Sequence, residues 1–157
     1  MQYNAIDIAH WFINRNLIDV KNQEDEKMTL MKLLKLLYYA EGSSLALNNK
    51  SLFPEKIVAW EHGPVVAEVY KKFPDAYNLS CPEKEIKDSL NKITETDKEL
   101  LEDVYSVFGK YSASGLRNKT HSEAPWKDAT DDGMHLKMEI SREAIKDYFK
   151  KHYVEEA

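Results

Sequence analysis

A chain of 157 residues has the length of one domain and can bury a core large enough to fold without disulfides or metals. Its 27 acidic residues outnumber its 22 basic residues, for a net charge of −5, which argues against nucleic acid as a partner. Cys81, the only cysteine, excludes an internal disulfide and fits a cytoplasmic location. Polar residues run through the N-terminal segment, so we expect neither a signal peptide nor a membrane-spanning segment.

The N-terminal third is predicted to hold two helices and a strand. Apolar residues recur at helical spacing in residues 4–17 and, more strongly, in residues 30–48, where Thr29 stands at the N-cap position. We expect the second of these helices to be the central one. Residues 57–61 are short and β-prone, which predicts a strand.

The middle of the chain continues with helices. Residues 65–73 carry a helical apolar stripe, whereas residues 74–93 are polar and irregular and are expected to form a loop. Thr96 and Glu99 have the spacing of a capping box, which predicts a helix that runs to Tyr111.

The C-terminal third contains shorter elements. Ser114 is expected to cap a short helix that ends near His121, and a further helical turn is expected at Pro125. Residues 136–140 alternate in polarity, which predicts a strand. Ser141 then caps a helix with an apolar face.

Two isolated strands would leave their backbone groups unpaired, so we expect residues 57–61 to pair with residues 136–140. The predicted fold class is therefore mainly α: a single-domain helical bundle with a small two-stranded β element. We expect residues 1–157 to form this one domain.

The stretch around Gly63 and Pro64 is interpreted as a joint between strand and helix. Proline is favoured at the first helical position, and glycine allows a sharp turn before it. A phosphate site at the new helix N-terminus is the alternative, but Pro64 removes one N–H donor there. Trp60 is expected to anchor the core. His62 is expected to bond the backbone at the joint, with an exposed polar contact as the alternative.

Glu41 lies on the apolar stripe of the predicted central helix. A buried carboxylate needs a partner, and Lys35, His62 and His121 are the candidates. The alternative is that the stripe rotates and Glu41 reaches solvent. Gly42, in mid-helix, indicates close approach by another element, because glycine lowers helix stability there by about 1 kcal/mol relative to alanine.

His121 and Glu123 could form a hydrolase pair, with the histidine as base and the carboxylate orienting it. A metal site would need further ligands at a suitable spacing, which the other histidines and Cys81 do not offer. We prefer a structural interpretation, in which His121 meets the dipole at a helix end and Glu123 caps the next turn. The sequence thus predicts no catalytic and no metal-binding residues.

Taken together, these motifs resemble the signature of the Panacea antitoxin domain family, also called SocA-like or phage-associated GepA-like. The matching stretches are LLKLLYYAEGSSLALNNKSLFPEKIVAWEHGPVVAEVYKKF and THSEAPW. The resemblance extends from Asp7 to Phe149. The motif residues that it marks as structural or partner-binding are Lys35, Tyr38, Glu41, Trp60, His62, Gly63, Pro64, His121, Glu123 and Trp126.

This resemblance implies an antitoxin of a bacterial or phage toxin–antitoxin system, prophages included. The implied partner is a cognate protein toxin, neutralised by direct protein–protein binding. One branch of the family instead acts as an adaptor that delivers its toxin to a cytosolic protease. No cofactor and no enzymatic activity are implied. A DNA-binding regulator is a further alternative, suggested by the helices and by Lys71 and Lys72, but the acidic charge argues against it.

Finally, we expect Glu41, His62, His121 and Glu123 to converge at one joint, because each lies beside an anchor of its own segment and buried polar groups need hydrogen bonds. In this hypothesis they set the angle between elements and perform no chemistry.

Overall fold

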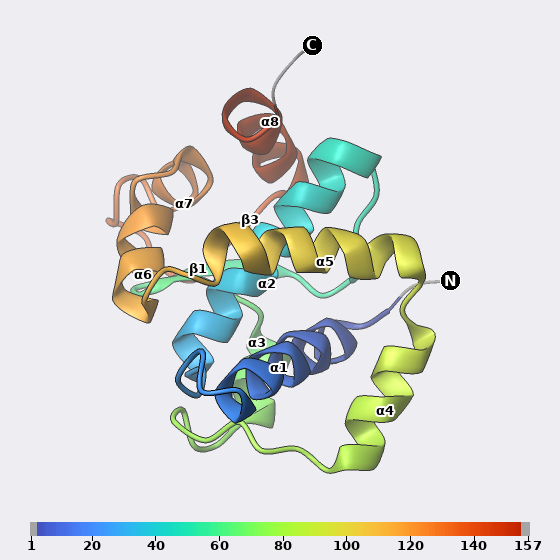
Figure 1. Cartoon of the computed structure of the whole chain (residues 1–157). Coiled ribbons are helices and arrows are strands. Elements are labelled where there is room, and N and C mark those ends of the chain that lie inside the picture. Colours follow the sequence, from blue (N-terminus) through green and yellow to red (C-terminus); the bar gives the residue numbers. More distant parts are fainter. Residues whose placement is uncertain (1–2, 155–157) are drawn as a thin grey trace.

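The computed structural model describes residues 3–154, which form eight helices and three short strands (Figure 1). The mainly α fold class is confirmed. In chain order the elements are α1 (Ala5–Lys21), α2 (Leu30–Asn48), β1 (Ile57–Trp60), β2 (Gly63–Val65), α3 (Ala67–Lys72), α4 (Glu83–Lys92), α5 (Glu95–Phe108), α6 (Ala113–His121), α7 (Ala124–Ala129), β3 (Met138–Ile140) and α8 (Arg142–His152). None of these helices combines the length and the apolar character that crossing a lipid bilayer requires.

Helix α2 is the central element, as predicted. Thr29 caps its N-terminus by accepting a hydrogen bond from the backbone N–H of Lys32 at 3.3 Å. The helix contacts α1, α5, α6 and α8, and Figure 1 shows α5 crossing in front of it. Leu33, Leu37 and Tyr39 are fully buried. A helix that buries nearly all its faces organises the core around itself.

Gly42 is a point of close approach between α2 and α8. A Cβ atom at this position would lie 2.5 Å from Cε1 of the Phe149 ring, well inside van der Waals contact. The Phe149 ring also meets the Tyr38 ring edge-on, with centroids 5.4 Å apart. The prediction that another element approaches Gly42 closely is therefore confirmed.

The predicted pairing of the two strands is confirmed, and a third strand joins them. Strand β1 is central in the order β2–β1–β3 and antiparallel to both neighbours. Ile57 pairs with Ile140, and Trp60 pairs with Gly63 across a two-residue turn. The sheet thus brings together segments about 80 residues apart in the chain.

The interpretation of Gly63 and Pro64 as a strand-to-helix joint is wrong. Both residues lie in β2, and α3 begins only at Ala67. Pro64 is tolerated because β2 is an edge strand, where a missing N–H can face away from the ladder. Gly63 has a φ of +114°, a conformation that residues with a Cβ rarely adopt. Glycine followed by proline therefore marks the hairpin turn between β1 and β2 and not the start of a helix.

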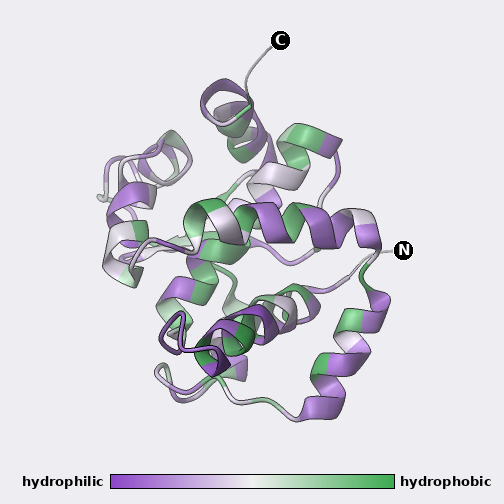
Figure 2. Ribbon diagram, in the orientation of Figure 1, coloured by the Kyte–Doolittle hydropathy of each residue, from purple (hydrophilic) through white to green (hydrophobic). Residues whose placement is uncertain are grey.

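Three other predictions are wrong in detail. Helix α4 occupies part of the expected loop, and Figure 2 shows that it is mostly hydrophilic. Its buried positions are few, Ile86 and Ser89 among them, so its apolar stripe is too narrow to detect. The N-cap of α5 is Thr94 and not the Thr96 capping box, and the N-cap of α6 is Ser112 and not Ser114. The N-cap Ser141 of α8 is as predicted.

Candidate functional site

The motif residues occupy three separate places around α2. Glu123 and Tyr38 meet between α2 and α7, Glu41 lies near the start of α8, and the remaining residues surround the β1–β2 hairpin. Each place joins elements that are distant in sequence. We describe them in turn as the phenol cluster, the arginine cluster and the hairpin cluster.

The phenol cluster consists of Glu123 and three tyrosines. The Glu123 carboxylate, 1% exposed, accepts hydrogen bonds from Tyr38 Oη at 3.0 Å and Tyr39 Oη at 3.1 Å. Tyr153 Oη donates a third. Glu123 stands at the N-cap position of α7, but within residues 3–154 its side chain makes no cap hydrogen bond. The predicted capping role is therefore wrong, because the side chain turns into the core.

Burial and hydrogen bonding shift the pKa of every group in the phenol cluster. Burial raises the pKa of Glu123, while the three phenol donors and Lys119 act to lower it. Burial, together with the nearby carboxylate, raises the pKa of Tyr38 and of Tyr39. The phenols therefore remain protonated donors at neutral pH. Such a cluster joins α2, the start of α7 and the end of α8 through one shared carboxyl group.

The arginine cluster holds the second buried carboxylate. Glu41 is fully buried and accepts hydrogen bonds from Arg142 Nε at 2.5 Å, the Leu52 N–H at 2.7 Å and Ser51 Oγ. Arg142 also donates to the carbonyls of Phe53 at 2.8 Å and Glu55 at 2.6 Å. One guanidinium thus joins α2, α8 and the segment before β1.

The predicted partners of Glu41 are all wrong, and so is the alternative of solvent exposure. Neither Lys35, His62 nor His121 hydrogen-bonds it in the described chain; its cation is Arg142, which sequence reasoning missed. No local signal marks that pairing, because the two residues are 101 positions apart. Tyr39 and Tyr153 were also missed, although Tyr39 directly follows a motif tyrosine.

The hairpin cluster begins with Lys35, whose side chain is buried between α2 and β2. Its Nζ donates to the Pro64 carbonyl at 3.4 Å, and only 1% of the residue is exposed. Burial, with a smaller effect from Arg117, lowers the pKa of Lys35 to about 7. A Cβ at Gly63 would lie 2.6 Å from Lys35 Cε and 2.8 Å from Thr120 Oγ1. A residue with a Cβ at position 63 would therefore need the Lys35 and Thr120 side chains to shift, in addition to a strained φ.

The aromatic part of this cluster ties the hairpin to α7. Trp126 Nε1 donates to the Trp60 carbonyl at 2.9 Å, and the His121 ring lies 4.1 Å from the Trp126 ring. Trp60 is half-buried at the edge of the core, where its ring meets Tyr70 edge-on. His62 is exposed and accepts a hydrogen bond from Arg117 Nε at 3.0 Å, which matches the alternative of an exposed polar contact.

The expected convergence of Glu41, His62, His121 and Glu123 at one joint is wrong for the two carboxylates, and only the two histidines lie near each other, in the hairpin cluster. Their hydrogen-bond partners differ: Arg142 for Glu41, tyrosines for Glu123 and Arg117 for His62. The hydrolase pair is not assembled, since no hydrogen bond within residues 3–154 links His121 to Glu123. The same residues contain no group of three His, Cys, Asp or Glu side chains that could hold a metal ion.

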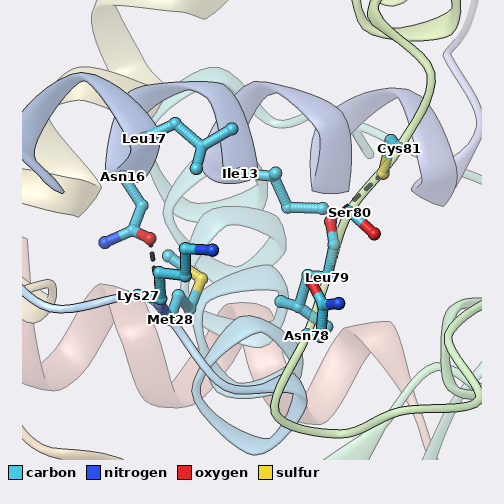
Figure 3. A pocket seen from close by; sticks show the side chains of 9 residues that line it. All are labelled: Ile13, Asn16, Leu17, Lys27, Met28, Asn78, Leu79, Ser80 and Cys81. Atoms are coloured by element: carbon cyan, nitrogen blue, oxygen red, sulfur yellow. Dashed lines mark hydrogen bonds between the residues drawn. The ribbon is translucent and has the colours of Figure 1, made fainter. Parts of the chain in front are cut away.

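A small hollow lies apart from these clusters, beneath α1 (Figure 3). Its volume is about 130 Å³, and Asn16 and Cys81 are among the residues that line it. The Asn16 side chain accepts a hydrogen bond from the Met28 N–H at 2.8 Å and so fixes the loop before α2. The Cys81 thiol donates to the Leu79 carbonyl at 3.4 Å, and burial raises its pKa. The thiol therefore stays protonated and unreactive at neutral pH.

Comparison with known proteins gives one match. Residues 33–127 match the family described as antitoxin SocA-like, Panacea domain. No curated protein and no solved structure matched the chain. Because the matched region covers more than half of the chain, the protein belongs to the SocA-like Panacea family, and an antitoxin role in general follows from that membership.

Proposed function

We propose that this SocA-like antitoxin neutralises one specific protein toxin by binding it directly in the cytoplasm, with residues 1–157 acting as a single domain. The observation that carries the proposal is that the buried charged motif residues are bonded inside the molecule. Glu41 is held by Arg142, Glu123 by three tyrosines and Lys35 by the Pro64 carbonyl. The motif builds joints in the core and leaves the surface to recognise a partner.

Co-expression with the product of the neighbouring gene tests this proposal. That product is expected to arrest growth when expressed alone and to be harmless when this protein is made with it. The two proteins should co-purify as a complex with intact toxin. A neighbouring product that is harmless alone, or that stays toxic beside this protein, contradicts the proposal.

The same experiment separates direct inhibition from delivery to a protease. Direct binding predicts that the amount of toxin stays constant or rises when the antitoxin is present, because a bound protein is protected from degradation. An adaptor predicts that the toxin disappears, and that it persists when cytosolic proteases are inactivated. Immunoblots over time with and without the antitoxin distinguish these outcomes.

An enzymatic antitoxin would behave differently under mutation. We expect His121→Gln to retain neutralisation as long as the protein is folded, since no hydrogen bond in the described chain couples His121 to Glu123. A folded variant without neutralising activity would show instead that His121 acts on the toxin directly.

A further inference from the structure

A groove lies between α2 and α5, with a volume of about 420 Å³. The buried core residues Leu100, Val104 and Phe108 line it, and exposed apolar side chains stand on either side. Leu47, at the end of α2, is 60% exposed, and Val107 on α5 is 50% exposed. Figure 1 shows the C-terminal turns of α2 beside α5. Large apolar side chains on both walls of one groove are typical of a partner-binding surface.

The rim of this groove is acidic. Glu99 and Asp103 are exposed on α5, and neither forms an ion pair within residues 3–154. Glu99, Asp103 and Val107 are four residues apart in succession, so they form one stripe about 12 Å long on the helix surface.

The C-terminal end of α2 adds negative potential, because the last carbonyls of a helix carry a partial negative charge. The last turns of α2 and α5, both fully within the described residues, contain no basic residue. Lysines near the end of α2 are already engaged: Lys50 pairs with Asp97, and Lys146 bonds Asn49.

We propose that this groove is the toxin-docking site and that it takes an amphipathic helix of the toxin. The helix would place an apolar ridge between Leu47 and Val107 and lysines or arginines against Glu99 and Asp103. The inference rests on the proposed antitoxin function and names the surface that performs it. A second copy of this chain is a poor occupant, because two acidic rims would face each other and the chain carries a net charge of −5.

Two double variants test the groove, with the purified product of the neighbouring toxin gene as the probe. Leu47→Asp with Val107→Asp removes the apolar walls, and Glu99→Lys with Asp103→Lys reverses the rim charge. The control for the apolar variant is Met134→Asp, because Met134 lies outside the groove and is 75% exposed. The control for the charge variant is Glu68→Lys with Asp128→Lys, because Glu68 on α3 and Asp128 on α7 are exposed acidic residues.

We expect each groove variant to weaken toxin binding by about tenfold or more in calorimetry, and to lose growth rescue. The toxin affinity of the controls should stay within about threefold of the wild-type affinity, and all variants should keep the wild-type melting temperature. Wild-type binding should also weaken with added salt, because the rim contacts are exposed charges.

If both groove variants fold and bind the toxin as tightly as wild type, the groove is not the docking site, while the proposed antitoxin function remains. Equal losses in the groove variants and the controls would overturn it as well. A wild-type dimer that the groove variants dissociate would assign the surface to a second copy of this chain. A wild-type protein that neither binds nor neutralises the toxin would remove the proposed function itself.

Discussion

Glu41, on the core helix α2, and Glu123, which contacts that helix from α7, are both buried carboxylates, but they are held in different ways. Glu41 faces one guanidinium, that of Arg142, whereas Glu123 faces the hydroxyls of Tyr38, Tyr39 and Tyr153. The first arrangement cancels a charge with an opposite charge. The second distributes one charge over three neutral donors.

This difference determines which kind of change should destabilise each buried carboxylate. An ion pair fails when its single cation is lost, because the remaining charge is buried without a counter-ion. A carboxylate with three donors loses only part of its support when one donor is removed. The first is therefore sensitive to mutation, and the second, whose carboxyl pKa is raised by burial, is sensitive to pH.

Removal of the cation is expected to have the largest effect. Arg142→Met leaves the Glu41 charge buried without its cation and removes the guanidinium hydrogen bonds to the carbonyls of Phe53 and Glu55, so the free energy of unfolding should fall by roughly 3–5 kcal/mol. Urea titration at pH 7 measures this. As a control, Lys87→Met breaks an exposed ion pair with Glu83 and should change stability by about 1 kcal/mol or less. Equal effects in the two variants would show that the buried pair is no more important than a surface pair.

A buried cation without a carboxylate partner sharpens the comparison. Lys35 has a pKa of about 7 in the folded protein and 10.5 in the reference state. Between these values the unfolded chain binds more protons, so this residue should make stability rise with pH by up to about 1.4 kcal/mol per unit. Urea titrations from pH 6 to 9 should show that the free energy of unfolding rises less with pH in Lys35→Met than in wild type. The exposed control Lys84→Met should show the wild-type rise. An identical rise in Lys35→Met and wild type would contradict the buried state of the ammonium.

Glu123 should show the opposite dependence. Its folded pKa lies above the reference value of 4.5, so the contribution of this group is fully present below pH 4.5 and is lost as the pH rises through the folded pKa. The slope is at most about 1.4 kcal/mol per pH unit. Glu123→Gln should remove this fall, measured as the difference from wild type between pH 4 and 7. The exposed control Glu102→Gln should keep the wild-type fall in stability. If the stability difference between Glu123→Gln and wild type did not change with pH, the pKa of Glu123 would not be shifted.

Single phenol deletions should give the smallest effects. Tyr38→Phe and Tyr39→Phe each remove one of three donors, so each should lower the free energy of unfolding by about 1 kcal/mol. Tyr153→Phe should have a smaller effect, because this residue is only half-buried. A double-mutant cycle between Tyr38 and Tyr39 reports whether the donors compensate for one another. A loss as large as that of Arg142→Met would refute the distributed support.

Local signals explain which parts of the fold were predictable. Thr29 and Ser141 cap helices whose apolar stripes are strong, and neither of the two β-prone segments had another predicted strand to pair with. Helix α4 escaped prediction because it buries one narrow edge of a charged segment. The β1–β2 hairpin escaped because glycine followed by proline also fits the start of a helix.

The site was less predictable than the fold. The sequence pointed to Glu41 and Glu123 as unusual, since carboxylates beside apolar residues need partners. It did not identify Arg142 or Tyr153, which lie 101 and 30 positions from the carboxylates that they bind, because these pairings depend on how α8 docks against the core. Only the assembled core reveals which donors face which carboxylate.

The distance along the chain between α2 and α8 has a consequence in time. Arg142 lies 101 positions after Glu41, and synthesis at about 5–20 residues per second separates them by roughly 5–20 s. During that interval Glu41 has no counter-ion, and the surface over Gly42 lacks the Phe149 ring that covers it. A newly made chain thus reaches its native packing only after α8 has been translated. The supply of folded protein therefore lags behind translation of α2 by the time needed to make the intervening segment.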